Sequence, residues 1–221
     1  MAEADRIASD ELGIPLESLM ENASHQIAVA ARLVLGGVAG KRIVAFAGTG
    51  NNGGDALGAL RHLGGWGAKV GVVLSSPAER LRPLARRQHD ILAAMGLKDD
   101  AVADNADLLI DGLLGYSAAG PPRDAVADLI RAANASRLPI LAVDLPSGLH
   151  PDTGELLGVT IRAALTVTLA LPKRGLIATR SRALVGDVLL ADIGIPPPVF
   201  DRLTIKTRGL FESGDLVRII P

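Results

Sequence analysis

The chain has 221 residues, 48% of them hydrophobic and only 2% aromatic, so one large domain with an aliphatic core is expected. With 23 basic and 24 acidic residues, the formal net charge is -1, which leaves no basic excess to bind nucleic acid or an anionic membrane. Cysteine is absent, which excludes disulfides and thiolate metal sites, and no apolar run is typical of a signal peptide or a membrane span, so a cytoplasmic protein is expected.

Helical and extended segments alternate along the chain. A short helix is expected at residues 2–12, and apolar residues three or four apart predict a longer helix at 16–35. Further helices are expected at 56–66, 77–95 and 123–134, and strands at 41–47, 68–74, 107–110, 139–143, 164–171 and 187–191. This alternation predicts an α/β fold with a parallel sheet that is covered on both faces. In the helix at 77–95, a solvated face is expected for Arg82, Arg86, Arg87 and His89.

Beyond Phe200 the alternating pattern weakens. Residues 204–221 mix polar side chains with one apolar run at 216–220. This stretch fits either a surface strand or a linker.

A glycine-rich stretch, Gly48-Thr49-Gly50-Asn51-Asn52-Gly53-Gly54-Asp55, lies between the first expected strand and the helix that follows it. Strand, glycine turn and helix form the geometry that brings backbone N–H groups close to a phosphate. A turn of this kind requires glycines, but it does not require two amides and a carboxylate. Asn51, Asn52 and Asp55 therefore indicate chemistry on a bound ligand.

Polar residues also follow three later strands. Asp111 comes after one apolar run, Asp144 with Ser147 comes after another, and Lys173 follows a third. Each acid alone fits a helix cap, but the carboxyl ends of parallel strands meet at one edge of a sheet, where ligands bind. An amide, a carboxylate and a hydroxyl gathered there suit a hard cation, and a monovalent ion is one candidate.

Two other interpretations of these motifs are disfavoured. The spacing Gly48-x-Gly50-x-x-Gly53 fits a dinucleotide fingerprint, but the second strand ends at Leu74-Ser75-Ser76 without the acid that would bind the ribose. Ser147 lacks the Gly-x-Ser-x-Gly context of a hydrolase nucleophile.

Several motifs together resemble one family, the NAD(P)HX epimerases, or YjeF amino-terminal domain family. The motifs are Leu19-Met20-Glu21-Asn22-Ala23, Gly50-Asn51-Asn52-Gly53-Gly54-Asp55, Asp111-Gly112-Leu113-Leu114-Gly115, Val143-Asp144-Leu145-Pro146-Ser147-Gly148 with Thr153-Gly154, and Gly186-Asp187-Val188 with Asp192-Ile193-Gly194-Ile195-Pro196. The resemblance covers residues 1–196. This chain departs from the usual family pattern at Ala56, where the family has glycine, and in the loop 115–120.

The resemblance implies a Rossmann-like three-layer αβα sandwich and an isomerase that interconverts the R and S forms of hydrated NADH and NADPH at C6. It implies substrate contacts by Asn51, Asn52, Gly53, Gly54, Asp55, Gly115, Tyr116, Ser117, Ala118, Ala119, Gly120, Pro121 and Asp144. It further implies a potassium ion held by Asn52, Asp111 and Ser147, and a homodimer.

Residues 1–200 are accordingly expected to form the YjeF amino-terminal domain. Residues 201–221 are expected to be a tail or linker, leading in a bifunctional parent to an ADP/ATP-dependent NAD(P)HX dehydratase domain.

Asp144 is the expected catalytic acid–base group, because it ends a central strand and its pKa can be tuned beside a desolvated ring. Lys173 is a weaker candidate for a phosphate contact. The alternative function is a non-catalytic module that binds an ADP-ribose-like nucleotide.

Overall fold

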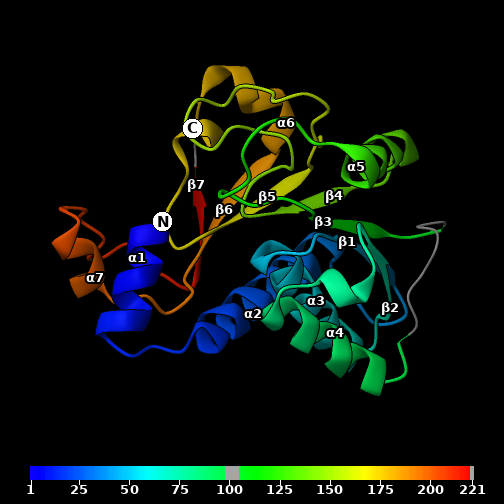
Figure 1. Ribbon diagram of the computed structural model, residues 1–221, viewed down its shortest axis with the longest axis horizontal. Helices are drawn as coiled ribbons and strands as arrows, with labels where there is room; N and C mark the ends of the chain where they lie inside the picture. The colour runs from blue at the N-terminus through cyan, green and yellow to red at the C-terminus, as the bar shows by residue number, and fades with distance from the viewer. Residues whose placement is uncertain (98–104, 220–221) are drawn as a thin grey trace.

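One sheet with the strand order β2-β1-β3-β4-β5-β6-β7 runs through the molecule (Figure 1). The computed structural model describes residues 1–97 and 105–219. Its strands are β1 (Arg42–Ala47), β2 (Lys69–Leu74), β3 (Leu108–Gly112), β4 (Ile140–Val143), β5 (Leu165–Leu169), β6 (Asp187–Ala191) and β7 (Leu216–Ile219). Neighbouring strands are parallel except for β6 and β7. The predicted α/β fold with a mostly parallel sheet is therefore confirmed.

Helices cover both faces of this sheet, as a three-layer sandwich requires. The helices α2 (Leu16–Leu35), α3 (Asn51–Gly65) and α4 (Pro83–Ala94) lie on one side, and α5 (Asp124–Ser136) and α6 (Arg182–Val185) lie on the other (Figure 1). The short helix α1 (Ala2–Arg6) continues into a π-helical turn (Ile7–Glu11), and α7 (Pro197–Arg202) follows β6. None of the described helices is both long and apolar enough to cross a membrane.

Side chains that alternate along the strands supply the two halves of the core. In β1, Ile43 and Ala45 pack in the cluster that contains α2 and α3, while Val44 and Phe46 pack in the cluster that contains α5. All residues of β3 and β5 are buried, as expected for central strands of a parallel sheet.

Several element boundaries differ from those predicted, and three of these differences concern the elements around the strand ends. The helix α3 begins at Asn51 and not at residue 56, so the Asn-Asn-Gly-Gly-Asp motif forms its first turns. Asp111 lies within β3 and not after it. The helix predicted at 77–95 is divided into a 3-10 turn (Ala78–Arg80) and α4, which has proline at its first position.

Low helix propensity explains the first of these errors. Each glycine in a helix interior destabilises the helix by about 1 kcal/mol relative to alanine, so the Asn-Asn-Gly-Gly-Asp motif is more typical of a turn. Packing against the strand ends, described below, outweighs this preference.

The carboxyl-terminal segment contains an edge strand of the same sheet. Strand β7 pairs with β6, with Leu216 opposite Ala191 and Ile219 opposite Val188. Of the two interpretations of this segment, the surface strand is confirmed. Ile220, where the predicted apolar run ends, lies outside the described residues. A dehydratase domain beyond the tail stays a prediction.

Candidate functional site

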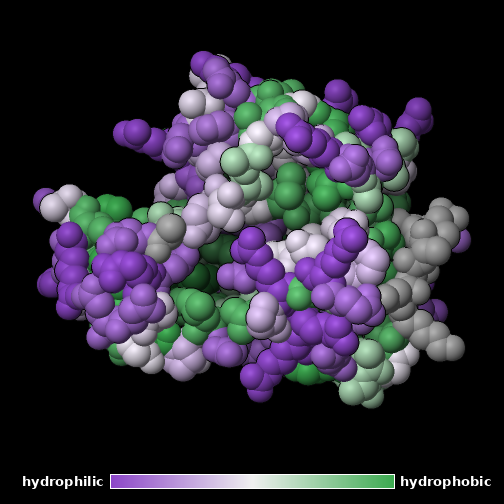
Figure 2. All heavy atoms as spheres, in the orientation of Figure 1, coloured by the Kyte–Doolittle hydropathy of each residue, from purple (hydrophilic) through white to green (hydrophobic). Residues whose placement is uncertain are grey.

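The strand order reverses between β1 and β3. From β1 the chain passes to β2 on one side, and it returns to β3 on the other side. Ligands of open α/β sheets bind in the crevice at such a point, beyond the carboxyl ends of the strands. A cavity of about 330 Å³ lies there, between α1, α2, the start of α3 and the loop that follows β3. Figure 2 shows a hollow in this region, with hydrophobic atoms at its bottom.

Glycines let α3 begin directly on the ends of β1 and β3. A Cβ atom on Gly48 would lie 2.0 Å from the carbonyl oxygen of Leu113, and one on Gly53 would lie 2.0 Å from the carbonyl oxygen of Gly48. A Cβ atom on Gly112 would lie 2.5 Å from the Cβ of Ala56. The absence of a side chain at these positions brings the first turns of α3, and with them the two asparagines and Asp55, to the cavity wall.

The structure brings most of the predicted substrate-binding residues together and leaves some of them aside. The cavity is lined by Asn51, Asn52, Asp55, Gly115, Tyr116, Ser117, Ala118 and Asp144. The residues Gly53, Gly54, Ala119, Gly120 and Pro121 are not part of its lining. Gly54 instead allows close packing, because a Cβ there would lie 2.6 Å from Cε of Met20. Substrate contacts by these five residues stay predictions.

Asp144 follows β4 in an unusual backbone conformation. Its φ is 68°, and the N–H of Leu145 donates to the carbonyl of Val143 at 2.8 Å, which closes a γ-turn centred on Asp144. Positive φ is uncommon for residues with a side chain and clusters at functional sites. The buried carboxylate accepts hydrogen bonds from the N–H groups of Tyr116 at 3.2 Å and Leu169 at 3.5 Å.

A second γ-turn stands beside the first, at the end of β5. Ala170 has a φ of 62°, and the N–H of Leu171 donates to the carbonyl of Leu169 at 2.7 Å. The Lys173 ammonium donates to the same carbonyl at 2.9 Å and forms a buried ion pair with Asp144. Lys173 is therefore bound to Asp144, which is a different role from the phosphate contact expected for it.

Asp55 presents a buried carboxyl group to the same cavity. It is 7% exposed, and within the described residues no hydrogen bond or ion pair reaches its carboxyl group. Burial raises the pKa of Asp55 well above its ordinary value, the carboxylates of Asp144 and Asp5 raise it further, and Lys173 opposes them. This environment favours the protonated form of Asp55, beside an aspartate that is paired with a lysine.

Two charged side chains of the cavity wall, those of Asp5 and Arg82, come from outside the motifs and strand ends marked in the sequence. Asp5 of α1 accepts a hydrogen bond from the Tyr116 hydroxyl at 2.9 Å, and burial raises the pKa of both groups. Arg82, expected on a solvated face, is exposed but also lines the cavity. No sequence pattern predicts a role in the cavity for either residue, because the sequence of a short helix or a loop does not show which strand ends that segment will cover.

The predicted metal ligands Asp111 and Ser147 lie next to each other outside the cavity lining. Ser147 donates to Asp111 from its hydroxyl at 2.7 Å and from its backbone N–H at 2.8 Å. The N–H of Leu113 donates to Asp111 at 3.2 Å, and that of Leu114 donates to the Ser147 hydroxyl at 2.9 Å. Burial raises the pKa of Asp111 to about 6, although its hydrogen bonds to Ser147 and Leu113 lower it.

Asn52, the third predicted ligand, reaches the same loop from α3. Its side chain packs against Gly115, where a Cβ would lie 3.2 Å from Asn52 Oδ1. The Asn52 Nδ2 atom is buried and has no hydrogen-bond partner among the described residues. Half a turn about the Cβ–Cγ bond would place the amide oxygen there instead. An amide, a carboxylate and a hydroxyl are together a donor set that suits a cation of low charge.

Comparison with known proteins agrees with this geometry. Residues 16–175 match the sequence model of the family described as YjeF-related protein N-terminus. An NAD(P)H-hydrate epimerase of Dehalogenimonas lykanthroporepellens is 39% identical over 99% of this chain and 90% of that protein. An NAD(P)H-hydrate epimerase of Limosilactobacillus fermentum is 36% identical over 87% of this chain and 93% of that protein.

Longer relatives and a solved structure extend the comparison. The Bifunctional NAD(P)H-hydrate repair enzyme Nnr of Moorella thermoacetica is 41% identical over 89% of this chain, which spans only 39% of that protein. The crystal structure of yeast ynu0 has the same fold, with a TM-score of 0.82 at 24% identity over 99% of this chain and 96% of the yeast chain. The chain belongs to the YjeF-related protein N-terminus family.

Proposed function

We propose that this chain is an NAD(P)H-hydrate epimerase, an isomerase that interconverts the R and S forms of hydrated NADH and NADPH at C6. The names of its relatives support the activity, since two of them match over most of both chains. The observation that carries the proposal is the pair of buried aspartates, Asp55 and Asp144, in one cavity with Lys173. Anion binding alone would not recruit carboxylates, whereas inversion at a carbon that bears a hydroxyl requires proton transfer.

The ring and the nucleotide part of the substrate occupy different parts of the cavity. The hydrated nicotinamide ring occupies the deep part, where Asp144 acts as the acid–base group and Leu19 and Met20 exclude water. The glycine-rich start of α3 and the loop 115–121 hold the nucleotide. Arg82, an exposed cation in the cavity lining, meets a phosphate of the dinucleotide.

A potassium ion held by Asn52, Asp111 and Ser147 belongs to this proposal. Two observations support it: the buried Asn52 Nδ2 atom has no partner within residues 1–97 and 105–219, and the carboxylate of Asp111 is buried. Bound there, the ion would neutralise Asp111 and fix the loop that follows β3. Epimerisation in sodium-free buffer should increase with added potassium chloride and not with choline chloride; equal rates in both salts would argue against the ion.

The proposal includes partners. Relatives named as bifunctional repair enzymes support a fused or separate ADP/ATP-dependent dehydratase that consumes one epimer. We also propose a cytoplasmic homodimer, as the family resemblance implies, and light scattering of the purified chain tests the dimer.

The test uses the epimer specificity of such a dehydratase. Purified R-form hydrate is supplied with an S-specific dehydratase, and its consumption is followed by the return of NADH absorbance. Addition of the chain should make consumption complete and fast. An unchanged rate, together with measurable binding of the hydrate, would leave the non-catalytic nucleotide-binding module as the function.

A further inference from the structure

We propose that Asp55 and Asp144 hold one proton between them and act as a donor–acceptor pair for the epimerisation. Asp55 protonates the hydroxyl that leaves one epimer, and Asp144 accepts a proton from the water that enters on the opposite face. The inference rests on the function proposed above and names the two groups that carry out its proton transfers.

The surroundings of Asp144 fix it as the acceptor. Its carboxylate receives the Lys173 ammonium and the backbone N–H groups of Tyr116 and Leu169. All three are hydrogen-bond donors, and the ammonium also supplies a counter-charge to the carboxylate. The two γ-turns at the ends of β4 and β5 hold this arrangement in place.

The surroundings of Asp55 are the opposite. The group is buried, and among residues 1–97 and 105–219 nothing donates a hydrogen bond to it or forms an ion pair with it. A buried carboxylate without donors is unfavourable by several kcal/mol, so the proton stays on this oxygen. The group lines the cavity, so its O–H can donate to a ligand bound there. A bound hydroxyl is the acceptor that this geometry provides for.

Other titratable groups share the cavity, and they support the same division. They are Asp5 on α1, Arg82 before α4, Tyr116 after β3, Lys173 after β5 and the amino group of Met1. Asp5 accepts a hydrogen bond from the Tyr116 hydroxyl, and Lys173 forms its ion pair with Asp144. Arg82 is exposed. The negative charges of Asp144 and Asp5 raise the pKa of Asp55 further.

The chemical step is balanced in protons and electrons. The proton of Asp55 moves to the C6 hydroxyl, the C6–O bond breaks with its electron pair going to oxygen, and water leaves. The lone pair of the ring nitrogen forms a double bond to C6, which leaves one positive charge on the ring. Water then adds to the other face of C6, the double-bond pair returns to nitrogen, and one proton passes to Asp144. Solvent returns a proton from Asp144 to Asp55, and nothing is oxidised or reduced.

The first test compares Asp55→Asn with Asp128→Asn, which makes the same change on the exposed face of α5. We expect Asp55→Asn to lower kcat for epimerisation at least about 100-fold while binding of the NADH hydrate changes only a few-fold. Asp128→Asn should match the unmodified chain, and Asp55→Glu should recover part of the rate. Retention of more than about a tenth of kcat by Asp55→Asn would overturn the inference.

Two measurements on the unmodified chain keep the inference testable if Asp55→Asn does not fold. The kcat for epimerisation should fall as the pH rises through the raised pKa of Asp55, because the group then loses the proton that it donates. Each inversion in H₂¹⁸O should place one ¹⁸O at C6; an inverted product that keeps its original oxygen would overturn the step. A chain that inverts neither hydrate would refute the proposed function itself, which is a separate outcome.

Discussion

Asp144 combines a strained backbone with a buried charge, and both features direct its carboxylate into the cavity. A non-glycine residue at positive φ costs about 1–3 kcal/mol, which the surrounding structure must offset. The offset comes from the Lys173 ion pair and from the backbone donors at Tyr116 and Leu169. The residue with the strained backbone is thus the residue that is proposed to act in the epimerisation.

Asp144→Asn is expected to abolish epimerisation and to leave the fold intact. Asparagine tolerates positive φ nearly as well as aspartate, so the γ-turn should survive. The buried ammonium of Lys173 loses its counter-charge, which should lower the free energy of unfolding by about 3 kcal/mol. Far-UV circular dichroism, denaturant unfolding and the coupled dehydratase assay measure the three effects.

The double variant Asp144→Asn with Lys173→Met separates stability from chemistry. Removal of the unpaired ammonium should restore much of the lost stability, since a buried ion pair is often replaceable by apolar packing. Activity should stay absent. Near-normal turnover in either variant would remove Asp144 from the mechanism.

Single residues at strand ends were predictable, but their partners were not. Asp144 and Asn52 interrupt or follow apolar runs, which marks them in the sequence, and both line the cavity. That Lys173 pairs with Asp144 depends on the lateral order of β4 and β5 and on a γ-turn at Ala170. Local sequence does not encode these features, because they arise only when the sheet is assembled.

At the scale of elements, the start of α3 depends on close backbone contacts that only glycine permits. Gly53→Ala should lower the free energy of unfolding by about 1–3 kcal/mol, because the new methyl would lie 2.0 Å from the Gly48 carbonyl oxygen and force the helix outward. Gly50→Ala is the matched control. It lies three residues earlier, its φ is -91°, and no atom lies within 4 Å of its Cβ position. Equal stability of the two variants in urea unfolding would show that this packing is unimportant.

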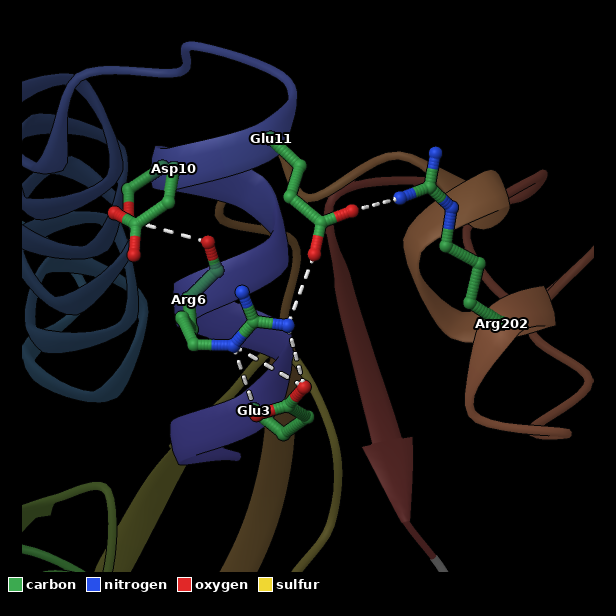
Figure 3. Close-up of polar contacts among 6 residues, drawn as sticks. Glu3, Arg6, Asp10, Glu11 and Arg202 are labelled. Carbon is green, nitrogen blue, oxygen red and sulfur yellow. Dashed lines mark hydrogen bonds and ion pairs between the residues drawn. The ribbon is translucent and has the colours of Figure 1, made fainter.

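The helix α1 is held over the cavity by charges on its outer side. Arg6 binds Glu3 and Glu11, and Glu11 also forms an ion pair with Arg202 of α7 (Figure 3). On its inner side Asp5 binds the Tyr116 hydroxyl. The outer network therefore positions a residue of the cavity wall.

Glu11→Ala should loosen α1 without affecting the sheet. We expect faster amide hydrogen exchange in residues 2–11 and a KM for the hydrate raised several-fold, with kcat nearly unchanged. Arg131→Ala is the control, since it breaks an exposed ion pair with Asp128 on α5. Unchanged exchange in α1 would mean that the ion pairs contribute nothing to its position, as is common for exposed pairs.

Element types were predictable from sequence where periodicity was strong, and boundaries failed where packing overrode propensity. The helix at 16–35 and the buried strands agree with the apolar patterns. The early start of α3 and the extension of β3 through Gly112 did not follow from those patterns. Both differences lie at the cavity, where Gly48, Gly53 and Gly112 serve tertiary contacts rather than local preference.

At the scale of the whole molecule, one sheet joins the site to the carboxyl-terminal segment. The loop after β6 contributes Ile193 to the cavity, and the N–H of Asp192 donates to the carbonyl of Asp215 at 2.9 Å. Strand β7 thus supports the far side of the site through β6. If a second domain follows in a longer protein, it would be attached to this edge of the sheet.

A chain that ends at Leu203 tests whether β7 is an integral strand. Leu216, Val217 and Ile219 are half-buried, and their removal with the pairing to β6 should cost about 3 kcal/mol, or about 6–12 °C in Tm for a chain of this size. Arg218→Ala is the control, because it removes only an exposed ion pair with Asp187 and should leave Tm nearly unchanged. The shortened chain should also aggregate on heating, since β6 becomes an open edge. An unchanged Tm after truncation would show instead that the segment behaves as a linker and that the sheet is complete at β6.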